Sequence, residues 1–373
     1  MPTISYLTRI EFEPGARHQL ASIAAGLGMA RPMIVTDKGL VAAGIVEMVT
    51  AALDGDAPVF DDTPTNPTEE AVRAALALFR ETGCDGLIAV GGGSPIDLAK
   101  AVALLATHDG PLASYAAIEG GVARIGPVKP LIAVPTTAGT GSEVGRAALI
   151  TLSDGRKLGL VSPHLIPSVA LCDPELTHGL PAGLTAATGL DAISHCVETY
   201  LSPRDNPVAE AIALDGLERA VTHLPAAVAD GSNAAARSEM MMAALEGGLT
   251  FQKGLGAIHA LSHPLGAVKA VSLHHGTLNA ILLPHVLEFN APACAGKYAV
   301  MRTRLGLADD ASLADFFTAF NRSLGLPATL KEVGLPQSEM APVSVAATKD
   351  HSAATNPRPA SAEDYLALMK AAY

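Results

Sequence analysis

The sequence lacks three features: a long apolar run, a cluster of basic residues and a CxxC cysteine pair. No segment approaches the roughly 18 consecutive apolar residues of a membrane helix, so we expect no membrane span. The formal net charge is −12. An acidic surface without a basic patch repels polyanions, which argues against nucleic-acid binding.

The scattered cysteines and the N-terminal residues both indicate a cytoplasmic protein. The four cysteines are typical of reduced thiols rather than of a disulfide framework. The first 15 residues include Arg9, Glu11 and Glu13 and lack an apolar core of signal-peptide length, so we expect no secretion signal.

The composition provides enough apolar material for a large buried core. Of the 373 residues, 49% are hydrophobic and 17% are charged, which argues against disorder. A domain usually takes about 100–200 residues, so the length favours two domains.

The first half of the chain alternates between short apolar, β-branched runs and helical patterns. Strand–helix alternation of this kind predicts a parallel sheet built from βαβ units. The expected strands are residues 32–36, 86–90 and 131–135, and the expected helices include 68–82 and 96–107.

The pattern of apolar residues changes beyond residue 183. There the spacing becomes helical, with Ala-rich segments at 208–224 and 234–249. The candidate junction is 173–183, which contains two prolines and two glycines. We therefore predict an α/β dinucleotide-binding domain over 1–178 and a helical metal and substrate domain over 179–373.

A glycine-rich turn follows the expected strand 86–90. Gly91, Gly92, Gly93 and Ser94 lead into a helix expected from about Pro95. Glycines let the backbone approach a ligand closely, and a helix start presents free N–H groups to a phosphate. The turn favours a pyrophosphate site, although it is not the usual G-x-G-x-x-G fingerprint and a tight connection would also explain it.

Two further strand ends are candidates for cofactor binding. Asp37 ends the first expected strand, where a carboxylate can accept hydrogen bonds from a ribose and repel the extra phosphate of NADP. It could equally be a turn-forming residue before Gly39. Residues 134–143, which include Thr136 and Thr137, could wrap a phosphate or ribose, or simply cap the next helix.

Histidines and one aspartate recur at helical spacing in the second half. Asp191 and His195 are four residues apart in a helical pattern, so both side chains share one face. His259 and His263 repeat this spacing. A single pair of this kind is usually coincidental, but two pairs followed by His274 and His275 favour a metal site.

The donor types indicate which metal and which chemistry. Imidazoles with one carboxylate suit Fe²⁺ or Zn²⁺, whereas Mg²⁺ and Ca²⁺ prefer oxygen ligands. A divalent cation lowers the pKa of an alcohol and polarises an aldehyde, while nicotinamide carries the hydride. The combination predicts a metal-dependent, NAD-linked oxidoreductase.

Taken together, these segments resemble the iron-containing (group III) alcohol dehydrogenases over nearly the whole chain. The resemblance implies an N-terminal Rossmann-like domain, an all-α C-terminal domain, a dehydroquinate synthase-like two-domain architecture and a homodimer or larger assembly. It rests on the motifs 34–37, 91–97, 135–143, 188–198, 259–266, 275–280 and 355–359.

The resemblance also implies specific roles. His263 would lie beside the nicotinamide as a proton relay, and Asp37 would favour NAD over NADP. The implied metal ligands are Asp191, His195, His259 and His275. The other implied cofactor residues are Asn66, Gly92, Gly93, Ser94, Asp97, Thr136, Thr137 and Lys157.

Two departures from the family pattern affect these expectations. The chain is about two residues longer between His263 and His275, and two adjacent histidines leave open whether His274 or His275 is the fourth ligand. Lys253 stands where many members carry Asn or Ala. We hypothesise that Lys253 pairs with a substrate carboxylate, as in a short hydroxy acid; a solvated surface lysine is the alternative.

The expected reaction is hydride transfer between NAD(H) and a small alcohol, aldehyde or short hydroxy acid, with Fe²⁺ or Zn²⁺ bound. One alternative is a reductase of an unsaturated keto acid, like the maleylacetate reductases. Another is a non-redox lyase that uses NAD and a metal, like dehydroquinate synthase. A non-enzymatic protein of this fold would be expected to have lost a ligand.

Overall fold

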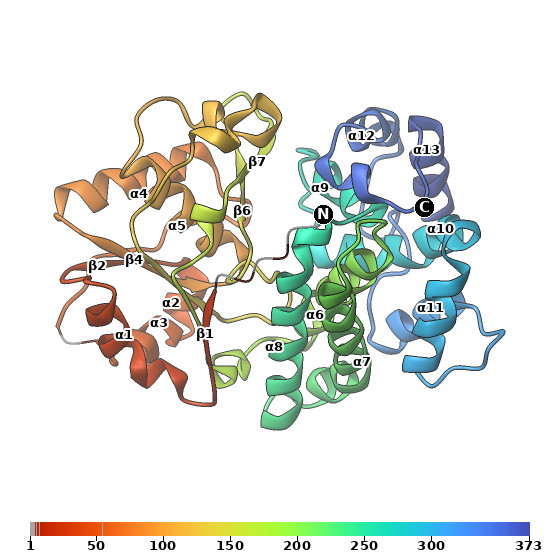
Figure 1. Ribbon diagram of the computed structural model, residues 1–373, viewed down its shortest axis with the longest axis horizontal. Helices are drawn as coiled ribbons and strands as arrows, with labels where there is room; N and C mark the ends of the chain where they lie inside the picture. The colour runs from red at the N-terminus through yellow and green to blue at the C-terminus, as the bar shows by residue number, and fades with distance from the viewer. Residues whose placement is uncertain (1–3, 5, 7, 54) are drawn as a thin grey trace. The chain divides into compact units, whose positions relative to one another are not determined.

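The structure is a computed structural model that describes residues 4, 6, 8–53 and 55–373. It divides into two compact units (Figure 1): one is Tyr6–Gly179, and the other is Leu180–Tyr373 together with Ile4. The first combines strands and helices, and in the second the described residues form helices and loops but no strand.

The N-terminal unit contains a six-stranded sheet in which every paired strand is parallel. The strand order is β1-β8-β5-β4-β2-β3. The two middle strands, β4 and β5, are buried along their whole length, as expected where both faces of a sheet are covered. The strands are β1 Arg9–Phe12, β2 Pro32–Val35, β3 Val59–Phe60, β4 Gly86–Gly91, β5 Leu131–Pro135 and β8 Val169–Cys172.

Helices cover both faces of this sheet. Successive strand residues point to opposite faces, so Met33 and Leu87 join one hydrophobic cluster while Ile34 and Ile88 join the other. Helices α4 and α5 contribute to the first cluster, and α1 and α3 to the second. These helices are α1 Leu20–Gly26, α2 Lys38–Ala42, α3 Ile45–Thr50, α4 Glu69–Glu81 and α5 Gly93–Leu105.

A short antiparallel hairpin was not anticipated from the sequence. Strands β6 (Ala147–Thr151) and β7 (Lys157–Val161) pair with each other and are separate from the main sheet. Gly155, at a φ of 87°, provides the left-handed conformation that the connecting turn requires.

The C-terminal unit is all-α, as predicted. Its central helix, α6 (Ala182–Leu201), is buried from Thr185 onward and packs against α7, α8 and α10. The other helices are α7 Pro207–Ala229, α8 Ala234–Leu249, α9 Ala257–Leu265, α10 His275–Arg304, α11 Leu313–Ser323, α12 Met340–Ala347 and α13 Ala362–Ala371. Among the described residues, no helix combines the length and apolar character needed to cross a membrane.

Candidate metal centre and cofactor loop

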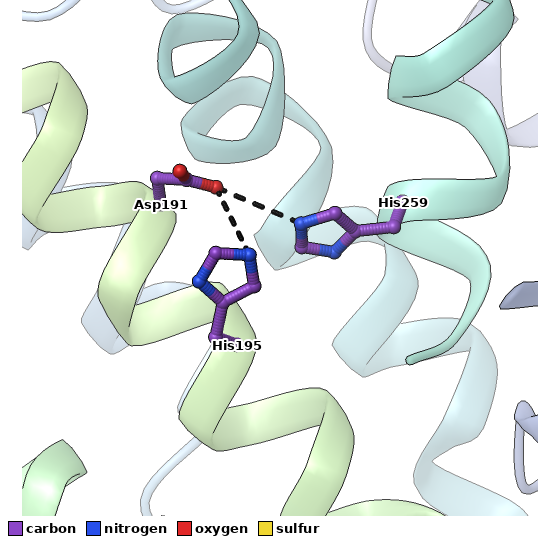
Figure 2. Close-up of side chains that lie close together, drawn as sticks. All are labelled: Asp191, His195 and His259. Carbon is purple, nitrogen blue, oxygen red and sulfur yellow. Dashed lines mark ion pairs between the residues drawn. The ribbon is translucent and has the colours of Figure 1, made fainter. Parts of the chain in front are cut away.

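Four side chains from three helices lie close together in the C-terminal unit. Asp191 and His195 lie one turn apart on α6, His259 lies on α9, and His275 is the first residue of α10. Figure 2 shows the first three pointing toward one another. Asp191 Oδ1 lies 3.5 Å from His195 Nε2, 3.6 Å from His259 Nε2 and 3.5 Å from His275 Nε2.

These separations fit one divalent cation. A tetrahedron with metal–ligand distances of about 2.1 Å has edges of about 3.4 Å, close to the observed donor separations. One carboxylate and three imidazoles are ligands that Fe²⁺ and Zn²⁺ accept. The side chains of Asp191, His195 and His259 are almost completely buried, and that of His275 is 34% exposed.

The backbone of α10 approaches α6 closely where it presents His275. A Cβ atom placed on Gly276 would lie 2.1 Å from the carbonyl oxygen of Ala187. Only glycine permits this approach. The contact places the start of α10 beside Asp191.

The electrostatics favour a charged carboxylate at this centre. Burial alone would raise the pKa of Asp191, but the imidazoles of His195, His275 and His259 outweigh burial and hold it well below its ordinary value. Asp191 is therefore an anion at neutral pH, as a metal ligand must be.

Two buried side chains contact these donors directly. The amide nitrogen of Asn279 donates to Asp191 Oδ1 at 2.8 Å and lies 3.2 Å from His259 Nε2. Glu198 Oε2 lies 2.6 Å from His259 Nδ1. Both residues fall within motifs of the sequence, but no role was assigned to them; the spacing of Asp191, His195 and Glu198, which places all three on one helical face, could have identified Glu198.

His263 is held beside the centre by a carboxylate. Its Nδ1 lies 2.9 Å from Asp350 Oδ2, and its ring stacks against His275 with centroids 5.6 Å apart. His351, which is more than half exposed, stacks on it as well, also at 5.6 Å. Burial alone would raise the pKa of Asp350, but the neighbouring His263 has the larger effect and holds the pKa well below its ordinary value. This carboxylate is therefore anionic. No sequence motif pointed to Asp350.

The structure distinguishes the two adjacent histidines. His275 Nε2 faces Asp191, whereas His274 precedes α10 as an exposed residue with its Nδ1 3.4 Å from Thr277 Oγ1. The geometry therefore favours His275 as the fourth donor.

The hypothesis for Lys253 is wrong, as is its surface alternative. The Lys253 side chain is 0% exposed, and its Nζ donates to Glu210 Oε1 at 2.5 Å and to the carbonyl oxygen of Tyr200 at 3.3 Å. A substrate carboxylate cannot reach an ammonium group that is already buried and paired. Lys253 instead ties the 3₁₀ helix Thr250–Lys253 to α6 and α7.

The glycine-rich turn packs closely against two threonines of the loop that follows β5. Added Cβ atoms would lie 3.1 Å from Thr137 Oγ1 at Gly92 and 3.1 Å from Thr140 Cγ2 at Gly93. Gly92 caps α5 without a side-chain hydrogen bond, so the first N–H groups of that helix have no side-chain cap. The helix begins at Gly93, two residues before the expected start.

Asp97 and Lys100 hold the neighbouring loop against α5. Asp97 accepts hydrogen bonds from Ser142 Oγ (2.6 Å) and Leu149 N (2.9 Å), so both of its oxygens already have protein partners. Lys100 Nζ, completely buried, donates to the carbonyl oxygens of Ser142, Gly145 and Ala147 at 2.7–2.9 Å. We infer that both residues support the loop.

The remaining predicted cofactor residues all lie in the N-terminal unit. Asp37 follows β2 and caps α2 by accepting from Leu40 N at 3.0 Å, so it does act as a capping residue. Lys157 Nζ donates to Asn66 Oδ1 at 2.9 Å. Thr136 is buried beside the end of β5, and the Ser94 hydroxyl donates to the carbonyl oxygen of Thr65.

Sequence comparisons match both halves of the chain to one family. The profile described as iron-containing alcohol dehydrogenase matches residues 8–174, and that of the family's C-terminal part matches residues 185–373. The 4-hydroxybutyrate dehydrogenase of Cupriavidus necator is 53% identical over 99% of both chains. The 1,3-propanediol dehydrogenase of Klebsiella pneumoniae is 37% identical over 97% of this chain and 96% of its own.

A comparison with solved structures agrees. A 1,3-propanediol oxidoreductase superposes with a TM-score of 0.94 at 36% identity, covering 100% of both chains. The fold of this chain is thus shared with a solved enzyme over the full length of both chains.

Proposed function

Since the chain belongs to the iron-containing alcohol dehydrogenase family, we propose that its preferred substrate is a short hydroxy acid of the 4-hydroxybutyrate type. The chain is an oxidoreductase that transfers a hydride between NAD(H) and a small alcohol, aldehyde or short hydroxy acid, with a divalent metal that is typically iron in this family. The observation that carries the substrate proposal is the 53% identity, end to end, to a 4-hydroxybutyrate dehydrogenase.

We assign the cation to Asp191, His195, His259 and His275. When bound, the cation supplies positive charge that favours loss of the substrate hydroxyl proton, while NAD accepts the hydride. Asp191 Oδ1 lies 3.5–3.6 Å from Nε2 of each of the three histidines, separations that suit a shared ion.

We assign the proton relay to His263. Its Nδ1 faces Asp350, which leaves Nε2 as the atom that exchanges a proton. Asp350 fixes the ring, so proton transfer needs no reorientation of the imidazole.

We assign the cofactor's pyrophosphate to the turn containing Gly92, Gly93 and Ser94 and its adenosine ribose to Asp37. Four further residues are assigned to cofactor binding: Asn66, Thr136, Thr137 and Lys157. Asp97 acts indirectly, through the loop that it holds. The corresponding functional division is a nucleotide domain over 1–178 and a metal and substrate domain over 179–373. We further propose a cytoplasmic homodimer, on the basis of the family resemblance and the unpaired cysteines.

Steady-state kinetics after reconstitution with Fe²⁺ or Zn²⁺ test the substrate proposal. We expect kcat/KM for 4-hydroxybutyrate to exceed that for 1-butanol and 1,3-propanediol by about tenfold or more, because a charged carboxylate gives a pocket more to recognise than a methyl or hydroxyl end. Equal values for the three substrates would overturn it. Substrate turnover without net change in NADH would instead indicate a non-redox lyase.

A further inference from the structure

A carboxylate behind the candidate metal centre contacts one ligand and the helix that carries it. Glu198 is 3% exposed and lies on α6 two turns beyond Asp191. One oxygen, Oε2, lies 2.6 Å from His259 Nδ1. The other, Oε1, accepts a hydrogen bond of 2.6 Å from the backbone N–H of Ile258.

The first contact determines which ring nitrogen of His259 can bind a cation. A carboxylate oxygen at 2.6 Å requires a proton on Nδ1. In the neutral imidazole the lone pair then lies on Nε2, the atom that faces Asp191 Oδ1 at 3.6 Å. The tautomer imposed by Glu198 is therefore the one that a ligand needs.

The second contact fixes the start of α9. Gly256, the N-cap residue, has no side chain to serve the first N–H groups of the helix. Glu198 serves Ile258, and Asn356 Oδ1 accepts from Ala257 at 3.0 Å. An added Cβ on Gly256 would lie 3.0 Å from Glu198 Oε1, so glycine is what lets the carboxylate approach.

We propose that Glu198 is a positioning residue for the metal centre, setting the tautomer of His259 and anchoring the helix that bears both His259 and His263. This inference rests on the proposed function, because it takes His259 to be a metal ligand. It assigns a role to a residue that does not itself touch the cation. Carboxylates that orient ligating histidines typically contribute 10–100-fold to metal affinity.

Glu198→Gln tests the proposal without changing the size of the side chain. A glutamine can accept from Ile258 N only by turning its NH₂ group toward His259 Nδ1, which forces Nδ1 to accept and moves the ring proton to Nε2. The opposite amide orientation restores the acceptor for His259 but sets NH₂ against the backbone N–H of Ile258. Neither orientation satisfies both partners.

The measurement is the dissociation constant of Co²⁺, determined on metal-stripped full-length protein by chelator competition and by the visible absorption of the bound ion. We expect Glu198→Gln to weaken Co²⁺ binding by about 10–100-fold. Glu198→Asp, which keeps a carboxylate but shortens it, is expected to fall between wild type and Gln and guards against misfolding of the first variant.

Asn356→Ala is the matched control, because Asn356 caps the same helix and its side-chain hydrogen bonds go to Ala257, Asn290 and Arg358 rather than to an imidazole. We expect it to lower the unfolding temperature while changing Co²⁺ affinity less than threefold. An unchanged Co²⁺ affinity in Glu198→Gln would overturn the role of Glu198. An equal loss in Asn356→Ala would overturn its effect on the His259 tautomer, because capping of α9 would then account for the loss. Absence of stoichiometric Co²⁺ binding by the wild type would instead refute the metal centre itself.

Discussion

The buried ammonium group of Lys100 offers a direct test of how the cofactor loop is held. Replacing Lys100 with methionine keeps an unbranched side chain of similar length and removes the charge. The carbonyl oxygens of Ser142, Gly145 and Ala147 then lose a donor at 2.7–2.9 Å. Ser142 Oγ, at 2.9 Å, loses one as well.

The magnitude follows from these acceptors. Each buried acceptor left without a partner costs about 1 kcal/mol or more, so three carbonyls give a loss of about 3 kcal/mol in the free energy of unfolding. For a domain of this size that corresponds to a fall of roughly 6–12 °C in Tm. Burial lowers the pKa of Lys100 to about 8, which reflects the cost of burying its positive charge. Methionine avoids this cost, and that gain in stability offsets part of the loss.

The same substitution should weaken cofactor binding. The loop that Lys100 holds continues back to Thr137 and Thr140, which pack against Gly92 and Gly93. If binding must first reorder this loop, the Kd for NADH rises by about tenfold, equivalent to ~1.4 kcal/mol.

Urea denaturation and NADH fluorescence titration measure the two effects. Lys331→Met, at an exposed position, is the control and should change the free energy of unfolding by less than about 0.5 kcal/mol. A loss below 1 kcal/mol for Lys100→Met, together with an unaltered Kd for NADH, would refute the role given to this lysine.

Three further predictions concern the C-terminal unit. Burial lowers the pKa of His259, but Glu198 and Asp191 outweigh burial and raise the pKa to about 9. A metal that binds His259 must displace the proton from the imidazolium, so Co²⁺ affinity should rise about tenfold per pH unit up to about pH 9 in a chelator-competition series. Because the pKa is raised in the folded apoprotein, the stability from this group is present below about pH 6.5 and is lost as the pH rises through about 9; a flat urea-denaturation profile would contradict this. Asp350→Ala should lower kcat by on the order of tenfold by freeing the His263 ring while leaving Co²⁺ affinity unchanged; an undiminished kcat would exclude the orienting role. Lys253→Met should destabilise the protein by about 1–2 kcal/mol, because it leaves Glu210 without this buried partner. It should reduce kcat/KM equally for hydroxy acids and neutral alcohols; a loss confined to hydroxy acids would restore a substrate role.

Much of the N-terminal fold could be predicted because its strands are continuous apolar runs bounded by turn residues. The ends of strands β2, β4 and β5 lie within one residue of the predicted segments. The hairpin of β6 and β7 was missed because its strands are only partly buried and adjacent to a loop rich in small residues. Alternation over five residues is too weak a signal there.

The candidate site was predicted in part for similar reasons. Helical spacing identified Asp191, His195 and His259 as residues that could share a centre, and the structure brings them together. Lys253 was misinterpreted because its burial depends on Glu210, a partner on another helix that sequence spacing cannot reveal. Asp350 was missed because it reaches His263 from a distant segment with no local motif.

The contact of Gly276 with the backbone of α6 has a consequence for how this centre can evolve. The separation between His275 and the donors on α6 depends on two main chains in van der Waals contact, and side-chain repacking cannot adjust such a contact. A change of metal preference would therefore require replacing the liganding residues or their hydrogen-bonding partners. The distance between His275 and the donors on α6 cannot change gradually, because the two main chains fix it. A methyl group at position 276 would test that constraint directly by spreading the two helices.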